Sequence, residues 1–92
     1  MPKYVIEREM PGAGQLNEHD LQSMSRRACA AINDLSRSIQ WVESFVTESK
    51  MYCVFIAPSA EVVAEHARLG GFPVDRISEV KTMIDPTTAE GI

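Results

Sequence analysis

The stretch Lys50–Pro73, KMYCVFIAPSAEVVAEHARLGGFP, decides the fold, because it encodes a strand, a turn, a helix and a helix stop in direct succession. The apolar run Met51–Ala57, rich in aromatic and β-branched residues, predicts a strand that is buried on both faces. Pro58 ends this strand, since proline cannot donate to a sheet ladder, and Ser59 is a good N-cap for a helix. The two glycines before Pro73 supply the backbone freedom that closes that helix.

The segments on either side predict three more strands and one more helix. KYVIERE at 3–9 is a strand in which Tyr4 and Ile6 share one face. A helix begins after Asn17, a good cap, and its apolar side chains recur three and four residues apart as far as Leu35. The last two strands are predicted from their β-branched residues and lie at 38–47 (SIQWVESFVT) and 75–84 (DRISEVKTMI).

The predicted order β-α-β-β-α-β is that of the ferredoxin-like α+β fold, a four-stranded antiparallel sheet with both helices on one face. We expect residues 1–92 to form one such domain, with a polar C-terminal tail at about 86–92.

The second face of this sheet is expected to lack helices. Alternation predicts one set of side chains toward the helices: Val42, Val46, Val54, Ile56, Val80 and Ile84. It predicts another set on the open face: Ile39, Trp41, Phe45, Met51, Cys53, Phe55, Ile77 and Met83. So much exposed apolar surface is typical of an interface, and we expect two copies to pair through it as a homodimer.

Composition limits the class of protein. A net charge of −4 with nine basic residues disfavours nucleic acid as a partner. No apolar run approaches the roughly 20 residues that span a bilayer, and the N-terminus has no apolar signal segment, so we expect a cytoplasmic protein with no membrane contact. The two cysteines, Cys29 and Cys53, are then expected to be reduced, small and buried.

Several segments are similar to those of a known family: PKYVIERE at 2–9, the Trp41 strand, YCVFIAP at 52–58, EHARLGGFPVDRI at 65–77 and IDPTTA at 84–89. Together they resemble a small bacterial family of uncharacterised ferredoxin-like proteins, one branch of which is described as nickel-binding. The resemblance implies a dimeric ferredoxin-like domain and a role in nickel sequestration or tolerance, with the ions held near the dimer surface.

Two residues in the family-like segments are candidate metal ligands. The ring of His66 leans toward the apolar side of its helix, where a neutral imidazole suits nickel. The alternative is a core histidine hydrogen-bonded to a strand residue such as Ser44 or Tyr52. Cys53 is either a thiolate ligand or a small apolar side chain.

Carboxylates and the second histidine complete the metal candidates. By alternation Glu7, Glu43 and Glu79 share the open face with Trp41 and Cys53, which leaves a cation site, a ligand cleft and plain surface exposure as interpretations. His19 is a possible ligand or part of a solvated helix cap. The metal candidates are therefore His66, Cys53, His19 and Glu43.

Two functions from different classes follow. The first is a non-enzymatic homodimer that binds nickel, with a divalent metal ion and a second copy as its partners. The second is a small-molecule-binding protein or small enzyme of the dimeric α+β barrel type, with Glu7, Trp41 and Tyr52 as ligand-binding residues and His66 helping to place the ligand. An enclosed cavity lined by such residues favours the second function, and a filled core favours the first.

Overall fold

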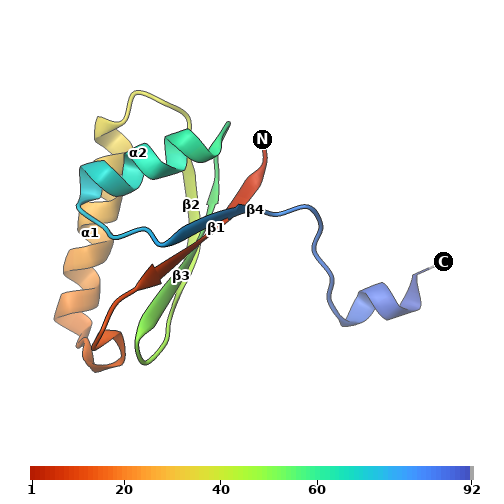
Figure 1. Ribbon diagram of the computed structural model, residues 1–92, viewed down its shortest axis with the longest axis horizontal. Helices are drawn as coiled ribbons and strands as arrows, with labels where there is room; N and C mark the ends of the chain where they lie inside the picture. Colours follow the sequence, from red (N-terminus) through yellow and green to blue (C-terminus); the bar gives the residue numbers. More distant parts are fainter. Residues whose placement is uncertain (92) are drawn as a thin grey trace.

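Four strands and two α-helices follow one another in the predicted order in the computed structural model, which describes residues 1–91 (Figure 1). Their bounds are β1 (Lys3–Glu9), α1 (Glu18–Asp34), β2 (Gln40–Val46), β3 (Lys50–Ile56), α2 (Ala60–Gly70) and β4 (Arg76–Glu79). The sheet order is β2-β3-β1-β4, with every neighbouring pair antiparallel. Both helices cover the same face of this sheet (Figure 1). The ferredoxin-like α+β fold is thus confirmed.

Capping side chains set the helix bounds. The Asn17 side chain accepts a hydrogen bond from the backbone N–H of Asp20 (2.8 Å), whose carboxylate accepts one from the backbone N–H of Asn17 (3.1 Å). This reciprocal capping box satisfies donors that the first turn of α1 leaves free. The Ser59 side chain caps α2 by accepting from the Val62 N–H, and Gly71 ends α2 with a φ of 71°, a conformation that favours glycine.

The direction of the β3 side chains was predicted wrongly. Tyr4 and Ile6 of β1 are buried beneath the helices, and in the ladder they lie opposite Phe55 and Cys53. Phe55, Cys53 and Met51 therefore face the helices, whereas Val54 and Ile56 face away. Apolar residues occupy both faces of β3, so its own alternation could not determine the direction, and the pairing with β1 does.

The predicted direction of the Trp41 side chain was also wrong, because β2 contains a bulge. The register shifts between Trp41 and Glu43, so Trp41 lies opposite Phe55 and Ser44 opposite Cys53, both on the helix side. The indole Nε1–H donates to Ser44 Oγ at 3.0 Å. An extra residue in one strand breaks strict alternation. Glu43 and Phe45 remain on the open face, as predicted.

The fourth strand is shorter than predicted. β4 pairs with β1 only as far as Glu79, and a last backbone hydrogen bond joins the Val80 N–H to the Lys3 carbonyl. Since β1 begins at Lys3, no partner strand remains for residues 81–84. Ile77 lies opposite Ile6, which places it and Glu79 on the helix side, contrary to the prediction for both.

The chain beyond β4 forms an arm that reaches away from the sheet (Figure 1). Met83 and Ile84 on this arm are 67% and 79% exposed. The predicted polar tail contains a 3-10 helix, η2 (Pro86–Glu90), which the Asp85 side chain caps by accepting from the Thr87 N–H. None of the helices in residues 1–91 has the length and hydropathy needed to cross a membrane.

Candidate ligand pocket

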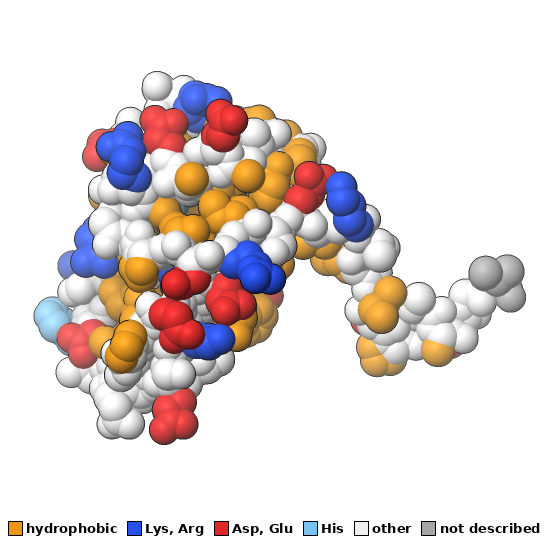
Figure 2. All heavy atoms as spheres, in the orientation of Figure 1, with side chains coloured by type: hydrophobic (Ala, Val, Ile, Leu, Met, Phe, Trp, Pro, Cys, Tyr) orange, Lys and Arg blue, Asp and Glu red, His pale blue; other side chains and the backbone are white. Residues whose placement is uncertain are grey.

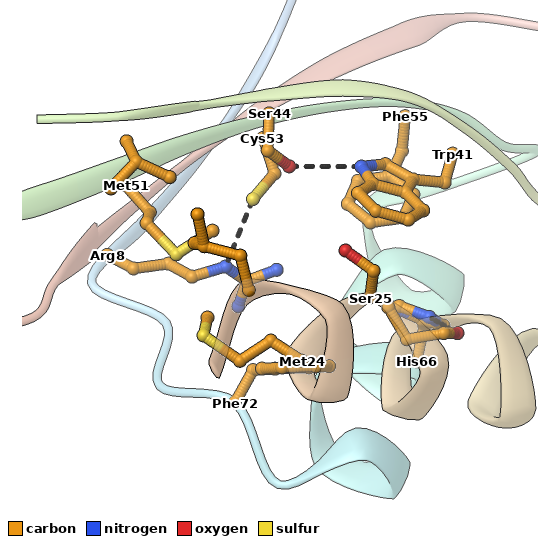
Figure 3. A pocket seen from close by; sticks show the side chains of 13 residues that line it. Arg8, Met24, Ser25, Trp41, Ser44, Met51, Cys53, Phe55, His66 and Phe72 are labelled. Carbon is orange, nitrogen blue, oxygen red and sulfur yellow. Dashed lines mark hydrogen bonds between the residues drawn. The ribbon is translucent and has the colours of Figure 1, made fainter. Parts of the chain in front are cut away.

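A cavity of about 150 Å³ lies between the helices and the inner face of the sheet. Trp41 and Ser44 of β2, Met51, Cys53 and Phe55 of β3, and Met24, Ser25 and Ala28 of α1 contribute to its wall, which is mostly apolar. Arg8 of β1, His66 of α2 and Phe72 also line the cavity, and Figure 3 shows these side chains from close by. Such a concave, largely apolar site with a few polar groups is typical of small-molecule binding.

Arg8 is the most unusual residue of the cavity, because its side chain is charged and only 2% of the residue is exposed. Its Nε–H donates to Cys53 Sγ (3.5 Å) and its Nη1 donates to the Pro73 carbonyl (2.5 Å), while its guanidinium carbon lies 5.4 Å from the centre of the Phe72 ring. It makes no ion pair within residues 1–91. A buried charge is costly unless it is compensated, and these contacts compensate it only in part.

His66 is fully buried and has one free ring nitrogen. Nε2 lies 2.9 Å from the Ala28 carbonyl, which can only accept, so Nε2 carries the proton and Nδ1 is left with a lone pair. Nδ1 has no hydrogen-bond partner in the part of the chain that the structure describes. Burial lowers the pKa of His66 below the usual 6.5 and the nearby Arg8 charge lowers it further, against the opposing hydrogen bond to Ala28. His66 is therefore a neutral core histidine whose partner is Ala28 and not Ser44 or Tyr52.

The Phe72 ring lies against both Arg8 and His66. Its ring stacks on His66 with 6.3 Å between centroids, and both Arg8 and the exposed Arg27 lie over it. Gly70 allows this arrangement, because a Cβ at that position would overlap the Phe72 ring. The glycine stop of α2 thus shapes the cavity as well as ending the helix.

Two of the three predicted ligand-binding residues lie on the other face of the sheet. Glu7 pairs with Tyr52 in the ladder, and both face away from the helices. The Glu7 carboxylate forms an ion pair with Lys50 (3.2 Å), which raises the pKa of Lys50. Trp41 alone of the three lines the cavity. The three residues predicted to bind one ligand therefore lie on opposite faces of the sheet.

The four predicted metal ligands also lie in different parts of the molecule. His66 and Cys53 both line the cavity, whereas His19 is exposed at the start of α1 and Glu43 is exposed on the open face. Within residues 1–91 no three His, Cys, Asp or Glu side chains lie close enough together to hold a metal ion.

The cysteines are both free thiols. Cys53 is buried, as predicted, but Cys29 is exposed, which corrects the expectation that both are buried. Cys29 lies next to Ala28 on α1, on the side of the helix that faces away from the sheet, so it falls outside the apolar stripe.

Arg8, Ser25 and Ser44 were missed as cavity residues. A signal for Arg8 was present in the sequence, because alternation in 3–9 places it on the same face as Tyr4 and Ile6. No comparable signal exists for Ser44, whose direction depends on the bulge.

The fold and the cavity define the class as a small ferredoxin-like α+β domain with an internal pocket. A family model described as nickel responsive protein SCO4226-like matches residues 4–80, so the chain belongs to that family. The crystal structure of SCO4226 from Streptomyces coelicolor A3(2) is similar, with a TM-score of 0.74 and 20% identity over 89% of this chain and 99% of that one. No curated protein matches the sequence.

Proposed function

We propose that this chain is a non-enzymatic cytoplasmic protein that binds or sequesters nickel as a homodimer. One observation carries the proposal: the chain matches a family described as nickel responsive over residues 4–80. Nickel is then the cargo of the protein, and its binding needs no reaction.

The donors for nickel come from the protein surface in this proposal. The cavity is a poor site for a divalent cation, because the Arg8 guanidinium contacts Cys53 and is close enough to His66 to lower its pKa. His19 is exposed, and imidazole with carboxylate and water oxygens suits Ni²⁺. Since one subunit has no group of three such donors within residues 1–91, a second subunit completes the coordination shell.

The homodimer needs a new structural basis, because most of the side chains predicted for the open face lie under the helices. An apolar patch nevertheless remains there, which we call the open-face patch: Val5, Phe45, Tyr52, Val54 and Ile56. Phe45 is 54% exposed, and the arm adds the exposed Met83 and Ile84. Figure 2 shows hydrophobic side chains on the body and along the arm. Such surface supports pairing of two copies.

Calorimetry with Ni²⁺ on protein without a polyhistidine tag tests the nickel proposal. We expect saturable heat that EDTA abolishes, and weaker binding for His19→Ala. Gln22→Ala, also exposed on α1, is the matched control and keeps wild-type affinity. Absence of any chelator-sensitive heat from the untagged protein contradicts the proposal.

A second candidate function is binding of a small organic molecule in the cavity. The observation that favours it is the cavity itself, lined by Trp41 and His66 and containing the buried charge of Arg8. A filled core would have argued against this candidate. The two functions use different parts of the molecule and are compatible with each other.

A further inference from the structure

The cavity contains one permanent charge and no group that neutralises it. Among the thirteen side chains that line it, Arg8 is the only one that is always charged, and none is Asp or Glu. Figure 3 shows the Arg8 side chain beside Cys53 and Met24, with Trp41 and His66 further along the cavity. The described walls therefore favour an anion and oppose a cation.

The guanidinium still has unused donors. Arg8 has five N–H groups, and its two hydrogen bonds within residues 1–91 involve only Nε and Nη1, so both hydrogens of Nη2 are without a partner there. Free hydrogens on a charged guanidinium nitrogen donate strongly to a carboxylate oxygen. A doubly charged phosphate fits less well, because its second charge would have no partner among the apolar walls.

The size and the walls of the cavity limit the ligand further. An engineered cavity of roughly 150 Å³ in another protein binds benzene, and the volume here is similar, about 150 Å³. Trp41 and Phe55 contribute aromatic rings and Met24 a thioether to the walls of this space, which suits a single ring.

We infer that this cavity binds a small monocarboxylate with one ring, whose carboxylate pairs with Arg8. The inference rests on the second candidate function and names its ligand class. It is independent of nickel binding, which we assign to the surface.

Trp41 provides the readout, because it is the only tryptophan of the chain and lines the cavity. Titration with benzoate is expected to change its fluorescence saturably. The uncharged isostere benzamide is expected to bind much more weakly. Equal affinity for benzamide and benzoate overturns the carboxylate assignment but keeps the second candidate function. A response to neither molecule overturns both.

Arg8→Met tests the charge, since methionine keeps part of the apolar stem. Losing one partner of a buried charge pair weakens binding substantially, so we expect the affinity for benzoate to fall by at least about thirtyfold. Arg27→Met is the matched control, because Arg27 also lies over Phe72 but is exposed, and it keeps wild-type affinity. Equal affinity of wild type and Arg8→Met overturns the inference.

A variant that leaves Arg8 in place protects the test against misfolding of Arg8→Met. Ser25→Phe fills the cavity from α1 and is expected to abolish the fluorescence response to benzoate. Unchanged benzoate affinity in a folded Ser25→Phe protein places the ligand elsewhere and overturns the inference.

Discussion

The guanidinium of Arg8 lies against the thiol of Cys53, with 3.5 Å between Nε and Sγ, in a part of the core where Arg8 is 2% and Cys53 4% exposed. Residues of β1 and β3 that lie on the same face of the sheet make this contact. Both residues line the cavity, and the Cys53 side chain is buried. The second thiol, on Cys29, is exposed on α1.

The two thiols should therefore react at very different rates. With a thiol reagent such as DTNB, we expect one thiol per native chain to react rapidly and the second only as the protein unfolds, because reagent access requires exposure. Cys29→Ser removes the rapid phase and Cys53→Ser leaves it in place. Two rapid thiols in the native wild-type protein contradict the burial of Cys53.

Stability should fall as the pH drops below about 6.5 because of His66. Its pKa in the folded state lies below the unfolded value of 6.5, so in this range the unfolded chain binds the proton more readily than the native protein does. The contribution is fully present above the unfolded pKa and is lost as the pH falls toward the folded pKa, by at most about 1.4 kcal/mol per pH unit. Urea unfolding at roughly half-unit steps between pH 5 and pH 8 measures this change in the free energy of unfolding.

Variants of the two histidines separate this effect from other titrations. His66→Gln should flatten the pH dependence of the unfolding free energy around pH 6, and His19→Gln, at an exposed position on α1, is the matched control. If the slope persists in His66→Gln, groups other than His66 cause the pH dependence of the unfolding free energy. Comparing slopes avoids any confusion with a constant loss of stability from the substitution itself.

The helix bounds could be predicted from the sequence because local chemistry sets them. Asn17, Ser59 and the glycines at 70 and 71 act within one turn of the chain, and the structure places caps at Asn17, Ser59 and Gly71. The order of strands and helices follows from the same local signals. The fold class was therefore accessible without any tertiary information.

Side-chain direction in the sheet could not be predicted in the same way. The direction of β3 depends on which residues of β1 it pairs with, and that of Trp41 depends on a bulge in β2. Both are long-range properties. Because of them, Trp41 and Cys53 line the cavity while Glu7 and Glu43 lie on the other side of the sheet. Arg8 is the exception, since alternation with Tyr4 and Ile6 already pointed to the helix side.

Phe55 is expected to be a major source of stability, because it is 1% exposed and packs at 5.0 Å between ring centroids against His66. Phe55→Ala should lower the free energy of unfolding by about 3–5 kcal/mol. If that variant fails to fold, Phe55→Leu provides the measurement, with a smaller loss of roughly 1–2 kcal/mol. Leu69→Ala on α2, where Leu69 is 43% exposed, should stay within about 0.5 kcal/mol of wild type. Similar losses for Phe55→Ala and Leu69→Ala would contradict the placement of Phe55 in the core.

The homodimer can be tested with a charge in the middle of the open-face patch. Phe45 lies opposite Tyr52 on this face, where a carboxylate would have to be buried if two sheets pack together. Phe45→Asp is therefore expected to shift the sedimentation mass from two chains to one at micromolar concentration. Gln22→Glu adds the same charge to the exposed face of α1 and should leave the dimer intact. A wild-type mass of one chain, or a Phe45→Asp protein that remains dimeric, removes the open face as the site of pairing.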